Sequence, residues 1–335
     1  MILNAGMGTR LRPITPALPK ALVPVMNRPL IDYSVELLER MGLTEIAVVV
    51  SPGDHATLER ARAIAAPGVT VHEAIQDEPR GIGDAAISPG ELLDGRNVVV
   101  LAADTLLIGD GGRYLEAFAG SGSAAGLVLA RVDDPRAFGV AVLEGDRVVD
   151  LEEKPAHPRS DLALVGLWLL GPEAVERVRT NPVINAKGES DLTATIGELV
   201  SEGSTVLGWQ TDGRWLDAGT VDGLLATHAE LLARSEAGGF TSTAASAPVA
   251  RSQLRGPVLI GEGSVIEDSE IWTSVVGAGA SVRGARLERC VVLPGAVLEG
   301  GSYCDVVITA AGETGGRGAL AGAGGRASQA RGFES

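Results

Sequence analysis

The sequence predicts an α/β protein with a doubly wound, mostly parallel sheet followed by a short parallel β-helix. Three observations predict this order. Short β-type runs alternate with helical patterns as far as about residue 105. Consecutive strand patterns and then helical patterns follow up to about residue 234. Beyond residue 256, apolar residues recur every 16 positions.

Strand and helix patterns alternate in the first third of the chain. The expected strands cover residues 1–4, 45–51, 69–74 and 97–103. Residues 29–41 and 54–65 carry helical patterns between them, and Gly42 is expected to end the first helix. Such alternation is typical of a Rossmann-like sheet, in which ligands bind beyond the carboxyl ends of the strands. The turn at Gly6–Gly8 and Asp104 both follow predicted strands, so we expect them at that edge.

Between residues 124 and 234 the pattern changes to consecutive strands and then helices. The expected strands are 124–132, 138–144, 147–152 and 163–170, and the expected helices are 172–180, 191–202 and 220–234. We expect this insertion to cover one side of the ligand pocket and to contact a second ligand.

The C-terminal part carries a repeat. Cut into sixteens from residue 256, the sequence puts Ile260, Val276 and Val292 in register. Three apolar positions per 16 residues, with glycine and small residues between them, predict a triangular parallel β-helix of about three coils. The predicted organisation is therefore a first domain at 1–234, a linker at 235–252, a β-helix at 253–308 and a disordered, glycine-rich tail at 309–335.

The composition indicates the cellular compartment and limits the classes of binding partner. The 335 residues are 45% hydrophobic and carry a net charge of −15, so we expect the chain to bind neither nucleic acid nor an anionic membrane. No apolar run reaches membrane-spanning length, and Met1 directly precedes the first strand, so no signal peptide is expected. Cys290 and Cys304 form no C-x-x-C pair, which favours a reduced, cytoplasmic setting without structural zinc.

The first 40 residues are locally basic, with five basic and three acidic side chains. Glycines let backbone N–H groups approach an anion, and Arg10 and Lys20 follow Gly6 and Gly8 within a few residues. Only three of the 28 basic residues are lysines, so arginine is the usual cation of this chain. Lys20 and Lys154 are therefore candidates for sites that need the compact positive charge of a lysine. This pattern indicates a polyphosphate site, although a structural turn and chance scatter of charge are the alternatives.

The string from Gly6 to Lys20 has the form G-x-G-T-R-L-R-P-x-T…P-K. It lacks the third glycine of a dinucleotide fingerprint and the G-K-[ST] ending of a P-loop. It resembles the signature of the sugar-phosphate nucleotidylyltransferases, strongly over residues 2–234 and as a generic repeat over 256–308. The resemblance implies a nucleotidyltransferase domain, a left-handed β-helix behind it, and transfer of a nucleoside monophosphate from an NTP to a sugar 1-phosphate with release of pyrophosphate.

The resemblance also implies roles for individual residues. The expected catalytic contacts to the triphosphate are Arg10 and Lys20. The expected nucleotide-binding residues are Ala5, Gly6, Gly8, Thr9, Gln76 and Gly81. The expected sugar-phosphate-binding residues are Gly139, Glu153, Lys154, Val165 and Trp168. The expected ligands of Mg²⁺ are Asp104 and Asp217, because paired carboxylates suit a hard cation.

Gln76 and several departures from the family pattern bear on the substrates. The amide of Gln76 can offer a donor and an acceptor to the imide edge of a pyrimidine, which favours dTTP or UTP, with glucose 1-phosphate as the favoured acceptor. Ala5 and Ala103 stand where glycine is usual, and Asp84 stands where thymidylyltransferases often have glutamine. Further departures are Trp168 for tyrosine and Asp191 for glutamate.

Three other interpretations stay open at this point. The substrates could be GTP or an unusual sugar-like phosphate. The chain could be a non-catalytic regulatory or sugar-nucleotide-sensing homologue, since Ala5 and Ala103 could weaken catalysis. An acyltransferase activity of the β-helix is disfavoured, because all four histidines precede the repeat. We therefore assign the repeat to packing, oligomerisation or regulation, and we expect a homo-oligomer.

Overall fold

The computed structural model describes residues 1–236 and 241–314. They divide into two compact units. The first unit combines Met1–Met7 with Leu30–Trp215, and the second combines Gly8–Pro29 with the chain from Leu216 onward. Within the described ranges, no helix is both long enough and apolar enough to cross a membrane.

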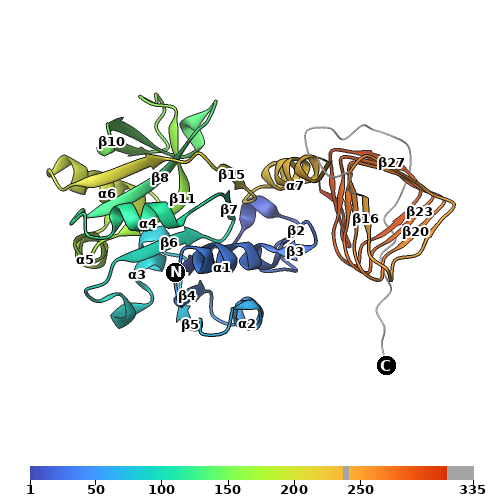
Figure 1. The fold of residues 1–335 in the computed structure, drawn as a ribbon, viewed down its shortest axis with the longest axis horizontal. Helices are drawn as coiled ribbons and strands as arrows, with labels where there is room; N and C mark the ends of the chain where they lie inside the picture. The colour runs from blue at the N-terminus through green and yellow to red at the C-terminus, as the bar shows by residue number, and fades with distance from the viewer. Residues whose placement is uncertain (237–240, 315–335) are drawn as a thin grey trace. The chain divides into compact units, whose positions relative to one another are not determined.

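The first unit is built on a nine-stranded sheet with the order β5-β4-β1-β6-β11-β8-β14-β10-β9 (Figure 1). The strands are β1 (Ile2–Leu3), β4 (Glu45–Val50), β5 (Thr70–Ile75), β6 (Val98–Ala102), β8 (Ala125–Arg131), β9 (Gly139–Glu144), β10 (Arg147–Glu153), β11 (Leu162–Leu170) and β14 (Val206–Gln210). In this sheet only β10 and β11 run against the other strands. The predicted doubly wound, mostly parallel sheet is confirmed.

Helices join these strands in the first unit. They are α1 (Leu30–Arg40), α2 (His55–Ile64), α3 (Ile82–Ile87), α4 (Gly112–Phe118), α5 (Pro172–Thr180) and α6 (Leu192–Ser201). Shorter elements are β7 (Thr105–Ile108), β12 (Val183–Ile184), β13 (Ser190–Asp191) and the 3₁₀ helices η3 (Gly90–Leu93) and η4 (Pro135–Ala137). The strands and long helices predicted in this range are present within two residues at each end.

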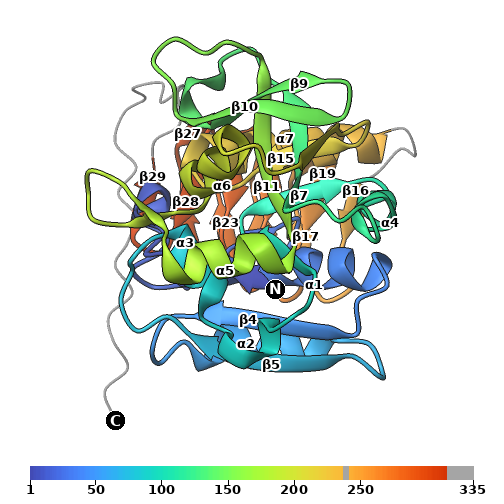
Figure 2. The same ribbon diagram turned by 90° about the vertical axis from the view of Figure 1, so that its left-hand side faces the viewer.

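Helices cover both faces of the sheet. On one face, Leu127 of β8 and Trp168 of β11 share a buried core with residues of α3, α5 and α6, which lie next to one another in Figure 2. The neighbouring Gly126 points to the other face, where a Cβ would come within 3.1 Å of Phe118 of α4. Because successive residues of a strand alternate between faces, α4 and α5 lie on opposite sides of the sheet.

The second unit begins with a loop segment and a helix. The segment contains η1 (Thr9–Leu11), η2 (Lys20–Leu22), β2 (Pro24–Val25) and β3 (Arg28–Pro29). Strand β15 (Arg214–Asp217) leads into this unit and helix α7 (Val221–Glu236) follows it. Nδ2 of Asn27 donates to the carbonyl of Val276 at 3.1 Å, so the segment is anchored on the β-helix.

The rest of the second unit is a parallel β-helix with three sheets (Figure 1). The first sheet holds β16 (Thr241–Thr243), β19 (Val258–Ile260), β22 (Val275–Val276), β25 (Val291–Val292), β28 (Val307–Thr309) and β29 (Gly312–Thr314). The second holds β17 (Val249–Ala250), β20 (Val265–Glu267), β23 (Ser281–Arg283) and β26 (Val297–Glu299). The third holds β18 (Gln253–Arg255), β21 (Glu270–Trp272), β24 (Arg286–Glu288) and β27 (Ser302–Cys304).

The register of these sheets matches the predicted repeat. Ile260, Val276 and Val292 stack on one another inside the core. Two further rows stack in the same way, namely Ile266, Val282 and Leu298, and Ile271, Leu287 and Tyr303. The 16-residue β-helix is confirmed, whereas its left-handedness stays a prediction.

The stack begins earlier than the sequence pattern predicted. Strands β16 and β17 lie inside the range 235–252 that was expected to be a linker, and they pair with the next coil. Thr241 pairs with Val258 and Val249 with Ile266, an offset of 17 residues instead of 16. The extra residue takes the first coil out of the 16-residue period. At the other end, residues 312–314 form β29 against β28, and the remaining predicted tail lies outside the described residues.

Candidate active site

The carboxyl ends of four parallel neighbours, β5, β4, β1 and β6, meet at one edge of the sheet. Leu3 of β1 lies opposite Val49 of β4 and Ala102 of β6, and Val50 lies opposite Ile75 of β5. The loops that leave these strands therefore start side by side. The sequence-predicted residues on them are Ala5, Gly6, Gln76 and Asp104.

The first loop is anchored to the neighbouring strand and helix. Nδ2 of Asn4 donates to Oδ2 of Asp54 at 3.0 Å, and Asp54 caps α2 by accepting from the N–H of Thr57 at 3.1 Å. Oγ of Ser51 donates to the carbonyl of Ala5 at 3.0 Å. Asn4 was not predicted from the sequence to be an anchor, although an amide directly after an apolar strand was a usable signal.

The two alanines that replace glycines do not present their methyl groups at the surface. Ala5 is 5% exposed and Ala103 is 0% exposed. Gly6 differs, because a Cβ there would meet no atom of the described residues within 4 Å. Packing inside the protein therefore does not require glycine at this position, and the space beside its backbone is open to a ligand.

The cationic part of the signature folds compactly within the second unit. Gly8 has a φ of +58°, and Oγ1 of Thr15 donates to its carbonyl at 2.8 Å. A Cβ on Gly8 would lie 2.8 Å from Cγ2 of Thr15 and 3.5 Å from Cβ of Lys20. The glycine thus allows the close approach of the two ends of this loop. It brings Lys20 next to the turn that carries Gly8, Thr9 and Arg10.

Asp217 lies at the turn between β15 and α7 in the second unit. Its Oδ1 accepts a hydrogen bond from the N–H of Gly219 at 2.8 Å. Gly223 packs so closely that a Cβ there would lie 2.2 Å from the carbonyl oxygen of Asp217. The backbone of Asp217 is therefore held firmly by the start of α7.

The two predicted metal ligands belong to different units. Asp104 follows β6 in the first unit and is 8% exposed, whereas Asp217 belongs to the second. In the part of the chain that the structure describes, no three His, Cys, Asp or Glu side chains form a group that could hold a metal ion. It stays a prediction that Arg10, Lys20 and Asp217 converge with the residues of the first unit.

Gln76 begins the loop after β5 and is buried. Its Nε2 donates to Oδ2 of Asp84 at 2.7 Å and to the carbonyl of Gly81 at 3.0 Å. From the sequence, this amide was expected to offer both a donor and an acceptor to a base. In the structure both amide hydrogens have partners, one in the loop and one in helix α3, which leaves the carbonyl oxygen Oε1 as the group to offer.

The same loop is fixed by the β12–β13 hairpin. Gly81 has a φ of +102°, and a Cβ on it would lie 2.4 Å from the carbonyl oxygen of Ser190. The N–H of Ser190 donates to the carbonyl of Arg80 at 2.6 Å. Glycine is therefore required at position 81 both for its backbone conformation and for this contact.

An irregularity in β11 brings Val165 to Asp104's loop. Leu164 pairs with Leu129 and Trp168 pairs with Leu127, so β11 contains two extra residues between them. The carbonyl of Val165 in this bulge accepts a hydrogen bond from Oγ1 of Thr105 at 2.9 Å. Thr105 directly follows Asp104, and this contact was not predicted from the sequence.

Trp168 lies in the core of the sheet. It is 5% exposed and pairs with Val100 and Leu127 on the adjacent strands. Its Nε1 has no hydrogen-bond partner in the described part of the chain. Its expected role at the sugar-phosphate site stays a prediction.

Gly139 and Glu153 face each other on β9 and β10. A Cβ on Gly139 would lie 3.1 Å from Oε2 of Glu153 and 2.9 Å from Cγ2 of Thr193. The absence of a side chain at 139 therefore leaves room for the Glu153 carboxylate between β9 and α6.

Lys154 follows Glu153 at the end of β10. Its backbone has a φ of +47°, and its N–H donates to the carbonyl of Phe138 at 3.0 Å. Its Nζ forms an ion pair with Glu153, with 60% of the lysine side chain exposed. An ion pair so exposed contributes little to stability, so the ammonium group can exchange its partner for a phosphate at small cost.

The predicted residues of the first unit thus form two groups. One group surrounds the ends of β5, β4, β1 and β6, and the other comprises Gly139, Glu153 and Lys154. Strand β11 touches both, because Cδ1 of Leu164 lies 3.1 Å from the Cβ position of Gly139 while Val165 binds Thr105.

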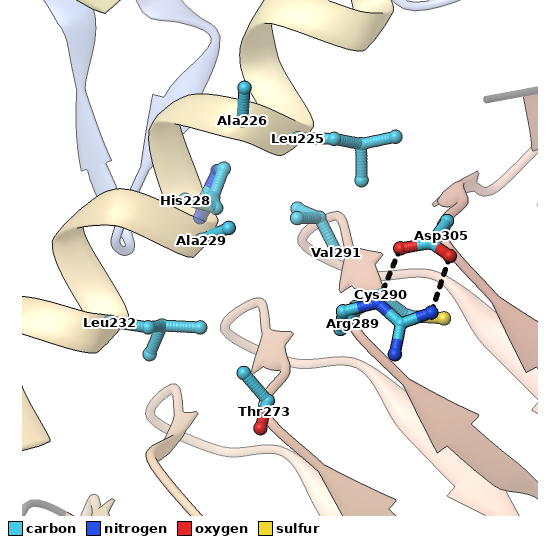
Figure 3. Close-up of a pocket in the computed structure, with 10 residues that line it drawn as sticks. All are labelled: Leu225, Ala226, His228, Ala229, Leu232, Thr273, Arg289, Cys290, Val291 and Asp305. Carbon is cyan, nitrogen blue, oxygen red and sulfur yellow. Dashed lines mark hydrogen bonds and ion pairs between the residues drawn. The ribbon is translucent and has the colours of Figure 1, made fainter. Parts of the chain in front are cut away.

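A cavity of about 140 Å³ in the second unit contains none of the predicted residues (Figure 3). Helix α7 supplies Leu225, Ala226, His228, Ala229 and Leu232, and the β-helix supplies Thr273, Arg289, Cys290, Val291 and Asp305. Arg289 is ion-paired with Asp305, which lowers the pKa of that carboxyl group. This cavity is therefore distinct from the predicted nucleotide and sugar-phosphate residues.

Comparison with known proteins places this geometry in a family. The family model described as nucleotidyl transferase matches residues 1–234. Glucose-1-phosphate thymidylyltransferase of Streptomyces antibioticus is 34% identical over 319 residues, which cover 90% of this chain and 88% of the relative. The enzyme of the same name from Streptomyces griseus is 31% identical over 316 residues, covering 85% of this chain and 89% of the relative.

A solved structure supports the fold. A Bacillus anthracis protein proposed to be a glucose-1-phosphate thymidylyltransferase, crystallised with a sucrose, is 27% identical and superimposes with a TM-score of 0.62. The match covers 72% of this chain and 96% of that one. The chain therefore belongs to the nucleotidyl transferase family and is one of its sugar-phosphate nucleotidylyltransferase enzymes.

Proposed function

We propose that the protein transfers a nucleoside monophosphate from dTTP or UTP to a sugar 1-phosphate, with glucose 1-phosphate favoured. A phosphate oxygen of the sugar phosphate attacks the α-phosphorus, the bond from that phosphorus to the β-phosphate oxygen breaks, and pyrophosphate leaves. The observation that carries this proposal is the shared sheet edge at which Gly6, Gln76 and Asp104 follow parallel strands. The names of the two Streptomyces relatives support the choice of substrates.

The attacking phosphate is already a nucleophile, so the protein needs no general base. It has to bring two anions together and neutralise them. We assign the triphosphate to Arg10 and Lys20, together with the backbone of Gly6, Gly8 and Thr9. We assign the base to Gln76 and Gly81. Ala5 directly precedes Gly6 and belongs to the loop that follows β1.

The sugar phosphate is assigned to the second group of residues. Lys154 exchanges its exposed ion pair with Glu153 for the phosphate, and Glu153 is then available to the sugar hydroxyls. Gly139 and Val165 border the space for the ring, and Trp168 supports it from the core.

Family membership implies magnesium. The donor set fits this ion, because Asp104 and Asp217 offer carboxylate oxygens, and Mg²⁺ is usually held by one or two carboxylates with phosphate oxygens and water completing its shell. When bound, the ion neutralises charge on the phosphates. A homo-oligomer, a cytoplasmic location, and the expected absence of nucleic-acid and membrane binding stay predictions.

Pyrophosphate release with a matrix of NTPs and sugar 1-phosphates tests this proposal. We expect the highest kcat/KM with dTTP or UTP and glucose 1-phosphate. A clear preference for GTP, or for another sugar-like phosphate, would replace the substrates and keep the reaction. Nucleotide binding without turnover for any pair would instead support a non-catalytic sensor.

A further inference from the structure

The amide of Gln76 has an orientation that its neighbours determine. Its outer nitrogen lies 2.7 Å from Oδ2 of Asp84 and 3.0 Å from the carbonyl oxygen of Gly81. A carboxylate and a backbone carbonyl can only accept hydrogen bonds, so the amide atom that faces both must be the nitrogen. The reverse orientation would place the amide oxygen against two acceptors.

The two contacts use the whole donor capacity of the side chain, because an amide nitrogen carries two hydrogens. Oε1 points the other way from the carboxylate and can only accept. Of the two acceptors, Asp84 is a carboxylate and Gly81 offers a neutral carbonyl. A hydrogen bond to an ionised acceptor is stronger than one to a neutral carbonyl, so the contact with Asp84 is the stronger of the two.

The frame around this pair is rigid. Gln76 is buried, and its N–H donates to the carbonyl of Val50 at 3.0 Å at the end of β4. Asp84 lies in α3, where its carbonyl accepts a hydrogen bond from Oγ of Ser88 at 3.0 Å. Gly81 is locked against Ser190. The carboxylate therefore acts from a fixed position.

We propose that Asp84 is a positioning residue for base selection: it holds the Gln76 amide so that only an acceptor is offered to the nucleotide base. This inference rests on the proposed function, in which Gln76 contacts the base. It defines the class of base as one with a ring N–H on its pairing edge, namely thymine, uracil or guanine. Cytosine and adenine present an unprotonated ring nitrogen there, which would meet Oε1 as acceptor against acceptor.

Equilibrium binding to the full chain tests the inference without requiring turnover. The probes are dTTP, dCTP and N3-methyl-dTTP, in which a methyl group replaces the hydrogen of the ring N–H. We expect the unchanged protein to bind dTTP on the order of 100-fold more tightly than dCTP or the methylated analogue. In Asp84→Asn the neighbouring amide can accept or donate, so only the carbonyl of Gly81 still requires the nitrogen of Gln76. The orientation of the Gln76 amide is then held less strongly, and the preference for dTTP over dCTP should fall about tenfold.

Glu78→Gln is the matched control, because Glu78 is an exposed carboxylate of the same loop that pairs with Arg80 and not with Gln76. It should leave the dTTP preference unchanged, and thermal melting should show that both variants are folded. An unchanged preference in folded Asp84→Asn would overturn the inference, as would equal or no affinity of the unchanged protein for dTTP and dCTP. If dTTP is preferred in binding and no sugar 1-phosphate supports turnover, the proposed function fails while the role of Asp84 stands.

Discussion

The β-helix and the edge of the nine-stranded sheet organise their polar contacts differently. In the β-helix, arginine and carboxylate side chains pair from coil to coil. Arg283 with Glu267 and Arg289 with Asp305 are each separated by 16 residues. At the sheet edge the partners follow no period, and several of them are far apart in the sequence. Thr105 binds Val165 across 60 residues, and Asn4 binds Asp54 across 50.

This difference indicates that the β-helix is a scaffold, whereas the sheet edge carries the candidate site. The ladder of charges on the β-helix is largely exposed, so each pair is screened by solvent and contributes little to stability. The stability of the β-helix comes from its stacked apolar core. The contacts at the sheet edge are few and irregular, and they fix loops that carry Gln76, Asp104 and Val165. Substitutions at the edge should therefore change activity, and substitutions in the β-helix core should change stability.

The largest effect is expected from the carboxylates assigned to magnesium. Asp104→Asn and Asp217→Asn should each lower kcat by about 100-fold or more, because a neutral amide stabilises a divalent cation and phosphate charge far less well. Steady-state pyrophosphate release measures this effect. Asp94→Asn, which alters an exposed partner of Arg179, is the control and should be close to unchanged. A near-normal rate in either site variant would remove that residue from the metal assignment.

The core of the β-helix should respond in stability. Leu287 is fully buried in the middle of the stack, so Leu287→Ala should cost about 2–5 kcal/mol of unfolding free energy through lost contacts and a cavity. Denaturant unfolding monitors the loss. Arg283→Ala, which removes only exposed ladder contacts, should destabilise the protein far less than Leu287→Ala. If the two variants were equally destabilised, the ladder would be more than a surface feature.

His228 predicts a pH effect in the second unit. Burial lowers its pKa to about 4, and only the carbonyl of Pro24 at 3.3 Å opposes this shift. The unfolded chain titrates near pH 6.5 and takes up the proton first, so stability present above that pH is lost as the pH falls toward 4. The loss should reach about 2–3 kcal/mol.

Unfolding free energies measured from pH 7 to 4.5 test this expectation. His228→Gln removes the titrating group and should flatten the dependence relative to the unchanged protein. His157→Gln alters an exposed imidazole and should keep the full slope. Equal slopes in all three proteins would mean that His228 is not the group responsible. Arg289 and Asp305 line the same cavity, and their ion pair is unchanged in every variant.

The smallest effect is expected at Lys154. Lys154→Ala should raise KM for the sugar 1-phosphate about tenfold and leave KM for the NTP nearly unchanged, because the lysine serves one phosphate. Lys187→Ala removes an exposed lysine outside the assigned site and is the control. A larger rise in KM for the NTP would exchange the two subsites.

Much of the fold could be predicted from local patterns. Hydrophobic periodicity located most strands and the longer helices of the first unit, although it missed β14, α3 and α4. The 16-residue repeat located the β-helix, because neighbouring coils repeat the same side-chain environment. The first coil was missed since one extra residue shifts Val249 out of that period. The position of β11 between β6 and β8 could not be predicted, because strand order depends on contacts between distant segments.

The candidate site shows the same division at the level of single residues. The sequence alone determined which residue types follow which strands, and so placed Gly6 and Asp104 at one edge, where the structure also has Gln76. Only the tertiary structure decided how those side chains are used. The orientation of the Gln76 amide follows from its hydrogen bonds to Asp84 and Gly81. The bulge in β11 places the carbonyl of Val165 within hydrogen-bond distance of Thr105. The reason is physical: periodicity records which face a residue occupies, whereas a hydrogen bond depends on atoms that distant parts of the chain bring together.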